Sequence, residues 1–468
     1  MSPTEQFQPV PTVLCDYIPE KRRADEKHIK HDSIPHLCHI ELTYACNQKC
    51  LFCYNPERAR LGDISIVDKI VENIAKSQIP HVYLIGGEPS LIPVKKLNEY
   101  IELLSDHSSV TIVTNGLKRL EKISDKLACF GVPLHGSKPE THEFLNKTKG
   151  SFLKTTSNIK YYIDSGFDVR CIPVLTGYNF NQMYDIINIA ANLEMESVYV
   201  DRYEDGGLGA TSSKECLLKP TSKQFYDATT QIIKAKKDFE IFEGRVGFGT
   251  AIPYCIDKRL ITNKITSNCG VGSTFCAINP KGEFRICNQS QLVFGNILEE
   301  SIEKIWSKKS IDIFRNLLWV REPCNSCSLI LECTGGCKVD TSCSDKFCID
   351  YAVRKKIKPI SKKEALKFSP RTLSSTYPKE YRNFKINKYT KLSLRPQEKF
   401  VVTRYQTVKL NNLAAKILTK ILNKSIKSEK NLIKYFANKI EEKEIRIFLS
   451  RLFQIEALDF VESDKNVN

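Results

Sequence analysis

The 468-residue sequence has no apolar run that approaches the length needed to cross a membrane, about 18 residues, so no transmembrane helix is expected. Its first 35 residues are polar and charged and contain no apolar core of a signal peptide. These absences predict a cytoplasmic protein with no membrane partner. Thiols stay reduced in that compartment, so the 18 cysteines predict metal or redox chemistry in place of disulfides.

Acidic residues are scarce relative to basic ones. The sequence has 54 Asp and Glu against 70 Lys and Arg, a net charge of +16, and many of the basic residues follow position 354. This excess is compatible with nucleic-acid binding, with an acidic peptide partner, or with an ordinary solvated surface. With 41% hydrophobic and 26% charged residues, the composition predicts a folded protein of roughly two to four domains.

The most informative stretch covers residues 37–54, where a short apolar run leads into Cys46, Cys50 and Cys53 at C-x3-C-x2-C spacing. Three thiolates on one loop can hold three irons of a [4Fe–4S] cube and leave the fourth iron open to a small chelating molecule. A structural zinc site would need four closed ligands, and a disulfide would pair only two of the three thiols. The spacing therefore favours an iron–sulfur cluster.

From residue 37 onward, short β-branched runs alternate with helical stretches, which is typical of α/β folds with right-handed βαβ units and a parallel sheet. The expected strands cover residues 37–42, 82–85, 110–113, 130–134, 169–174 and 197–203. The expected helices cover residues 64–76, 93–104, 151–165 and 181–193. In such folds, ligands bind at the carboxyl ends of the strands.

Two candidate ligand-binding turns follow the second and third expected strands. They are Gly86-Gly87-Glu88-Pro89 and Thr114-Asn115-Gly116. Adjacent glycines let a backbone approach a ligand closely, and Glu88 could accept a hydrogen bond from a ligand's ammonium group. Either sequence alone is compatible with an ordinary turn. Their position at strand ends next to the cysteine loop favours ligand binding.

The cysteine loop, with its trailing aromatic residues and Tyr54-Asn55-Pro56, resembles the signature of the radical S-adenosylmethionine (SAM) enzymes. In that family the amine and carboxylate of SAM chelate the open iron, and reductive cleavage of SAM yields a 5′-deoxyadenosyl radical. The resemblance implies a partial (β/α)6 barrel, and the strand count agrees. It also implies contacts to SAM from Phe52, Tyr54, Gly86, Gly87, Glu88, Pro89, Thr114, Asn115, Asn146 and Arg202.

The segment from His142 to Phe152 resembles the family pattern His-Asp-x-x-Arg-x-x-x-Gly-Ser-Phe, with one departure. Asn146 stands where an arginine often contacts the SAM carboxylate. Asparagine supplies neither the charge nor the two-bond fork of an arginine. Lys147, Arg170 and Arg202 are alternative sources of that charge.

A second cysteine-rich region lies between residues 269 and 348. Cys269, Gly282 and Cys287 are followed by a C-x2-C-x5-C-x3-C run that begins at Cys324, with further cysteines behind it. Paired C-x2-C sites are compatible with zinc ribbons. The complete spacing instead resembles the SPASM extension of radical SAM enzymes, which carries two further [4Fe–4S] clusters.

The resemblance divides these cysteines between the two auxiliary clusters. The first is expected to use Cys269, Cys276, Cys287 and Cys337. The second is expected to use Cys324, Cys327, Cys333 and Cys348, with Cys343 as the alternative last ligand. Cys255 lies near the region as a spare ligand or a substrate-side thiol. The other thiols are interpreted as small buried residues: Cys15, Cys38, Cys129, Cys171 and Cys216.

The C-terminal part of the sequence predicts a small separate module. Residues 354–388 are basic and rich in turn residues, as in a linker. A hairpin is expected over residues 392–410, then helices over 413–422, 427–437 and 442–453, and a last strand over 457–461. This outline is that of a winged helix, which could bind DNA. Its apolar spacing resembles PqqD-like domains, which bind leader peptides by strand addition.

Together these features predict five segments: residues 1–36 as an extension, 37–240 as the radical SAM barrel, 241–353 as the SPASM domain, 354–388 as a linker and 389–468 as the recognition domain. The resemblance implies an enzyme that modifies a ribosomally made precursor peptide, for example by a thioether, C–C or C–O crosslink. It implies a flavodoxin- or ferredoxin-type reductant and a leader that is acidic. Two alternatives are a protein-activating enzyme that oxidises Cys or Ser, and an iron–sulfur redox sensor that binds nucleic acid.

Overall fold

The computed structural model describes residues 31–338, apart from residues 56, 60, 205–217, 267 and 321, and residues 383–461. An eleven-stranded sheet runs in the order β11-β10-β9-β1-β2-β3-β4-β5-β7-β6, with β8 paired to β7, and its two ends do not pair among the described residues. Its strands are β1 (Leu37–Glu41), β2 (His81–Ile85), β3 (Ser109–Val113), β4 (Cys129–Val132), β5 (Val169–Cys171), β6 (Val174–Leu175), β7 (Ser197–Arg202), β8 (Val246–Phe248), β9 (Phe275–Ile278), β10 (Glu283–Arg285) and β11 (Val293–Asn296).

The expected six-stranded partial barrel is confirmed. Strands β1, β2, β3, β4, β5 and β7 pair in parallel in this order. The strand expected over residues 169–174 is divided into β5 and β6. Strand β9 joins β1 in parallel, and β10 and β11 follow it in antiparallel, so the cysteine-rich region extends the sheet of the barrel.

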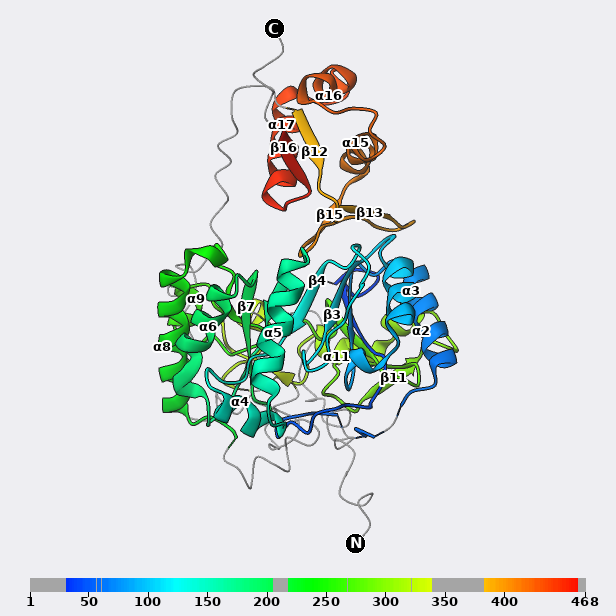
Figure 1. The fold of residues 1–468 in the computed structure, drawn as a ribbon. Helices are drawn as coiled ribbons and strands as arrows, with labels where there is room; N and C mark the ends of the chain where they lie inside the picture. The colour runs from blue at the N-terminus through cyan, green and yellow to red at the C-terminus, as the bar shows by residue number, and fades with distance from the viewer. Residues whose placement is uncertain are drawn as a thin grey trace.

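Helices connect the parallel strands and cover one face of the sheet (Figure 1). The four expected helices are α2 (Ile64–Ser77), α3 (Val94–Leu104), α5 (Ser151–Asp164) and α6 (Met183–Asn192), and the structure also contains α4 (Pro139–Asn146) and α8 (Ser222–Asp238). Short helices follow in the cysteine-rich region: α9 (Arg259–Thr262), α10 (Ile302–Trp306), α11 (Asp312–Arg315) and α12 (Ile330–Cys333). In the described ranges, no helix combines the length and the apolar character of a membrane span.

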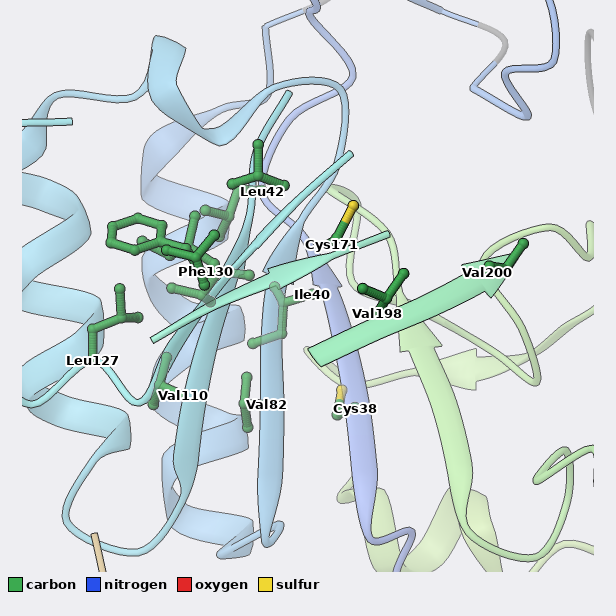
Figure 2. Close-up of a cluster of buried hydrophobic side chains, with 14 of the residues drawn as sticks. Cys38, Ile40, Leu42, Val82, Val110, Leu127, Phe130, Cys171, Val198 and Val200 are labelled. Atoms are coloured by element: carbon green, nitrogen blue, oxygen red, sulfur yellow. The ribbon is translucent and has the colours of Figure 1, made fainter. Parts of the chain in front are cut away.

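The main core lies between the sheet and its helices. Figure 2 shows Cys38, Ile40 and Leu42 of β1 and its extension beside Val82 and Val110 of the neighbouring strands. Because side chains alternate along a strand, the residues between them face the inside of the barrel. That inner face is polar: the ring of His39 stacks on Tyr83 with centroids 5.1 Å apart.

The C-terminal module contains two small sheets and three helices around its own core. A three-stranded antiparallel sheet is formed by β13 (Lys391–Leu394), β14 (Lys399–Val402) and β15 (Thr407–Leu410). The helices are α15 (Asn412–Leu422), α16 (Glu429–Phe436) and α17 (Glu442–Gln454). Strand β12 (Asn383–Ile386) pairs with β16 (Leu458–Val461). Residues 383–386 therefore belong to this fold and not to the expected linker.

The three-stranded sheet of the module packs on the amino ends of the barrel strands (Figure 1). Asp168, just before β5, accepts hydrogen bonds from Arg404 and Tyr405 in the turn between β14 and β15. Ser109, the first residue of β3, donates to Arg404 O at 2.8 Å. The module thus covers the end of the barrel formed by the amino ends of its strands, which is called the floor of the barrel below. The cysteine loop begins at the opposite end, where the strands have their carboxyl ends.

Candidate active site

The cysteine loop begins where β1 ends, and the turn after β2 holds its backbone. Gly87 N donates to Thr43 O at 2.6 Å. Glu88 N donates to Ala45 O at 2.8 Å. A Cβ atom on Gly87 would lie 2.0 Å from Ala45 O, and a Cβ atom on Gly86 would lie 2.4 Å from a backbone oxygen of the same loop. Only glycine permits this approach, so the two glycines fix the start of the cysteine loop.

The thiols of Cys46, Cys50 and Cys53 lie together in the half-buried loop. Burial raises the pKa of Cys46 to about 11, and burial together with the two neighbouring thiols raises the pKa of Cys50. Backbone N–H groups of Gln48 and Asn55 donate to the sulfurs of Cys46 and Cys53, each at 3.4 Å. Such thiols become thiolates when a positive centre compensates their charge. This donor set fits an iron–sulfur cluster.

Glu88 connects the turn after β2 to the turn after β3. Its buried carboxylate accepts from Thr114 Oγ1 at 2.6 Å and from Asn115 N at 2.8 Å. Burial raises the pKa of Glu88, whereas these donors favour its charged form. Asn115 Nδ2 also donates to Asn47 Oδ1 at 2.6 Å and lies 4.0 Å from Cys46 Sγ. Six of the predicted SAM contacts therefore lie together beside the cysteine loop: Gly86, Gly87, Glu88, Pro89, Thr114 and Asn115.

The two aromatic residues predicted to contact SAM have different neighbours. The ring of Phe52 packs edge-on against His135, with centroids 4.6 Å apart. Tyr54 lies beside Glu41 and Asn288, and burial and the Glu41 charge raise the pKa of its phenol. Asn288 directly follows Cys287, so Tyr54 joins the cysteine loop to the cysteine-rich region.

Asn146 is not directed at the cofactor site. Its side chain is fully buried, where Nδ2 donates to Ser151 Oγ at 2.9 Å and Oδ1 accepts from Thr148 N at 2.9 Å. Its backbone oxygen accepts from Lys49 N at 3.2 Å, in the middle of the cysteine loop. The backbone of Asn146 therefore supports the cysteine loop. Its side chain is occupied by the turn that follows α4, through its bonds to Thr148 and Ser151.

The alternative cations are placed differently from one another. Arg170 is the middle residue of β5, and its guanidinium reaches the amino end of the barrel, where it donates to Tyr83 Oη at 2.8 Å and lies 5.2 Å from the centre of the Tyr405 ring. That end is opposite the cysteine loop, so Arg170 cannot replace the missing arginine. Arg202 is at the carboxyl end of β7, buried, with its Nε 3.8 Å from Glu204 Oε1. Arg202 keeps its place as a predicted SAM contact.

Three polar residues of the barrel interior were missed by the sequence analysis. Glu41, at the end of β1, forms a buried ion pair with Arg285 of β10 at 2.5 Å. Asp201 of β7 lies in the interior, where burial raises its pKa to about 7. The signal for Glu41 and Asp201 was available, because each occupies an inward position near the carboxyl end of its strand. Arg285 had no such signal, because its strand belongs to the added part of the sheet.

The structure brings two of the four predicted ligands of the first auxiliary cluster, Cys269 and Cys287, near each other. Burial raises the pKa of Cys287 to about 12, and the nearby thiol of Cys269 contributes to this rise. Cys269 N donates at 3.1 Å to Thr334 Oγ1, three residues before Cys337. Thr334 lies between Cys333 and Cys337, so this bond joins Cys269 to the segment that carries both of these thiols.

Cys276 does not join this group. It lies on β9 directly opposite Cys38 of β1, in the main core, and burial raises its pKa well above the ordinary range. The preceding residue, Phe275, packs instead against the small core around Val271 and Phe314, as Cys269 and Cys287 do. Successive residues of a strand point to opposite faces, so the Cys276 thiol points away from the predicted cluster. The expectation for Cys276 is corrected on this ground.

The predicted ligands of the second auxiliary cluster share one small pocket with a further thiol. Cys324, Cys327 and Cys333 line it together with Cys255. The other expected ligand, Cys348, and its alternative, Cys343, lie outside the described residues. Across the described positions, no three His, Cys, Asp or Glu side chains are arranged as ligands of a single metal ion.

Comparisons with known proteins identify two parts of the chain. The sequence profile of the radical SAM superfamily matches residues 40–190, and that of the SPASM iron–sulfur cluster-binding domain matches residues 269–328. Both ranges end before the C-terminal module, whose PqqD-like character stays a prediction.

Similar proteins align with about two thirds to three quarters of the chain. Mycofactocin maturase MftC of Mycobacterium ulcerans is 27% identical over 319 residues, which are 64% of this chain and 81% of the relative. PqqA peptide cyclase of Rhodopseudomonas palustris is 23% identical over 377 residues, 75% of this chain and 94% of the relative. The crystal structure of SuiB of Streptococcus suis has the same fold, with a TM-score of 0.52 and 17% identity over 68% of this chain and 77% of SuiB.

The family matches agree with the geometry of the two thiol-rich regions. The radical SAM range contains the Cys46 loop and the turn at Glu88, and the SPASM range contains Cys269, Cys287 and Cys324. The chain therefore carries a radical SAM domain over residues 40–190 and a SPASM iron–sulfur domain over residues 269–328, and it is an enzyme that uses SAM and [4Fe–4S] clusters.

Proposed function

We propose that this enzyme is a peptide maturase, which abstracts a hydrogen atom from a ribosomally made precursor peptide and so installs a crosslink or a related modification. The observation that carries the proposal is the kind of protein to which the chain is similar. A mycofactocin maturase, a PqqA peptide cyclase and the subtilosin biosynthesis protein AlbA are similar to it over 64%, 75% and 57% of its length. SuiB, which has the same fold, has been crystallised with its precursor peptide SuiA.

The residues around the cysteine loop have roles that suit this chemistry. When bound, the cluster and SAM supply a 5′-deoxyadenosyl radical. Cys46, Cys50 and Cys53 would hold the cluster, while Glu88 and the backbone at Gly86 would hold the amine of SAM beside it. The polar interior of the barrel, with Glu41 and Asp201, would orient the peptide and manage protons.

The precursor would be held by the C-terminal module. Strands β13 and β15 are the outer strands of its three-stranded sheet, and an extended leader could add to an edge of this kind. Holding the leader there would raise the local concentration of the core peptide near the barrel. Because the chain carries a net charge of +16, an acidic leader would bind more tightly at low salt. Tight, salt-independent binding of a neutral leader would contradict this point.

The enzyme would work in the cytoplasm, with an external one-electron donor of the flavodoxin or ferredoxin type, and without a membrane or nucleic-acid partner. The SPASM clusters would pass on the electron left after hydrogen abstraction, or bind a thiolate of the substrate.

The test is co-expression with the short peptide encoded by a neighbouring reading frame, followed by mass spectrometry of that peptide. The proposal predicts loss of a hydrogen pair per crosslink, or another defined mass change, with the wild-type chain. The Cys50→Ala variant should leave the peptide unchanged, because it lacks one ligand of the cluster. A peptide that stays unmodified beside oxidised Cys or Ser in a folded protein partner would instead support a protein-activating enzyme.

A further inference from the structure

We propose that Cys255 is the fourth protein ligand of the second auxiliary cluster, together with Cys324, Cys327 and Cys333. The sequence pattern had placed this role on a cysteine behind position 337. The inference concerns how the chain holds a cofactor and does not depend on the identity of the substrate.

The first observation is the composition of the pocket. Four of its nine lining residues are thiols, and they come from two segments that are far apart in the sequence. The remaining walls carry no charged side chain: they are Pro253, Tyr254, Leu329, Ile330 and Gly335. Iron–sulfur clusters are held by cysteine thiolates, and the hydrophobic shell around a cluster controls its exposure to solvent and its reduction potential. A pocket of four thiols with apolar walls is suited to such a cluster.

The second observation is the way in which the Cys255 segment is fastened to the helix that carries Cys333. Tyr254 N donates to Cys333 Sγ at 3.4 Å, and Tyr254 Oη donates to Glu332 O at 3.2 Å. These two bonds hold residue 254 at both its backbone and its side chain. Its neighbour Cys255 is thereby kept at the same pocket, and the N–H group directed at a sulfur would also stabilise a thiolate there.

The third observation is the arrangement of the C-x2-C pair. Cys327 N donates to Cys324 O at 3.1 Å, so the two residues form one tight turn. Ile330 N donates to Cys327 O at 3.3 Å, which leads the chain directly into α12 and Cys333. Three thiols are therefore delivered from one side of the pocket. Cys255 lines the same pocket from another segment, and its thiol would complete the set of four ligands.

The other described thiols of the region are engaged elsewhere. Cys269 and Cys287 lie close to each other, and neither they nor Cys337 line this pocket. Cys276 points into the main core beside Cys38. Within the described ranges, Cys255 is thus the thiol from outside residues 324–333 that lines this pocket.

The experiment compares the iron content and EPR spectra of anaerobically reconstituted full-length variants. Wild type should carry about twelve irons in three cubes, and Cys255→Ala and Cys255→Ser should each lose about four, or convert one cube to a three-iron cluster with its own EPR signal. Cys276→Ala is the matched control and should keep the full iron content. The spectral change that SAM causes at the Cys46 loop should persist in every variant, which shows that the barrel is folded.

Cys348→Ala serves as the competing variant. Loss of iron in Cys255→Ala with full iron in Cys348→Ala supports the proposal. Full iron and unchanged spectra in Cys255→Ala overturn it. If both single variants lose iron, the Cys255→Ala/Cys348→Ala double variant distinguishes the two cases. A larger loss of iron than in either single variant shows that the two cysteines serve separate clusters and supports the proposal. A loss no larger than in Cys348→Ala places the two cysteines on one cluster and overturns the proposal.

Discussion

The close contact between the glycine turn and the cysteine loop makes Gly87→Ala an informative substitution. A Cβ atom at this position would lie 2.0 Å from Ala45 O and 2.4 Å from Tyr44 O, both backbone atoms that cannot rotate away. The two loops must separate, which breaks the hydrogen bonds of Gly87 N and Glu88 N to the cysteine loop. Each bond is worth about 1 kcal/mol, and overpacking adds about 1–3 kcal/mol. The expected cost is therefore about 3–5 kcal/mol.

A cost of this size falls on one loop and is below the total stability of most domains, about 5–15 kcal/mol. The Gly87→Ala chain should therefore stay folded, retain the iron of its auxiliary clusters and lose about four of roughly twelve irons at the cysteine loop. Release of 5′-deoxyadenosine from SAM under reducing conditions should fall with that iron.

Gly150→Ala is the matched control for this prediction. Gly150 adopts a positive φ, +75°, and a Cβ atom there would meet nothing within 4 Å. Its replacement should cost only about 1–2 kcal/mol of backbone strain and leave iron content and SAM cleavage unchanged. A Gly87→Ala protein with wild-type iron and wild-type SAM cleavage would refute the reasoning.

Three further predictions concern buried polar groups. Asp168→Ala removes the acceptor of Arg404 and Tyr405, so the turn between β14 and β15 should exchange its amide hydrogens about ten-fold faster or more, while unchanged exchange would show that this contact does not hold the module. Burial raises the pKa of Asp201 to about 7, above its unfolded value, so the folded chain binds the extra proton between about pH 4 and 7 and loses stability as pH rises through that range. Asp201→Asn should lessen this loss in urea unfolding at pH 5 and 8, and an unaltered pH dependence would contradict it. Glu88→Gln removes the charge proposed to bind the amine of SAM and should weaken SAM binding about ten-fold or more in equilibrium dialysis, with iron content retained.

The placement of the C-terminal module limits how leader recognition can be studied. Deletion of the module would uncover the floor of the barrel, where Arg170 meets Tyr405 and Ser109 meets Arg404. A truncated chain could lose activity through the barrel alone. Substitutions on the outer strands of the module, away from these contacts, separate the two effects.

The strand and helix pattern of the barrel was predictable because both periods are strong in the sequence. The expected helix over residues 64–76 is α2, whose buried Val67, Ile70, Val71 and Ile74 repeat at helical spacing. The C-x3-C-x2-C spacing and the position of Glu88 were also sufficient, because parallel strands bring their carboxyl ends together.

Other features depend on tertiary contacts that spacing does not encode. Cys276 fits the spacing of a ligand, but its position in β9 places its thiol on the core-facing side of the strand, opposite Cys38. Arg170 has the right charge, but its guanidinium reaches the wrong end of the barrel. Cys255 stands 69 residues before Cys324, so only folding shows that both line one pocket.

The most direct test of the proposed function follows a hydrogen atom from the peptide to SAM. A precursor peptide from the neighbouring reading frame, uniformly deuterated, would be incubated with reduced holoenzyme and SAM, and the released 5′-deoxyadenosine analysed by mass spectrometry. The proposal predicts one deuterium in this product, formed together with the modified peptide. 5′-Deoxyadenosine without deuterium, beside an unmodified precursor, would contradict it.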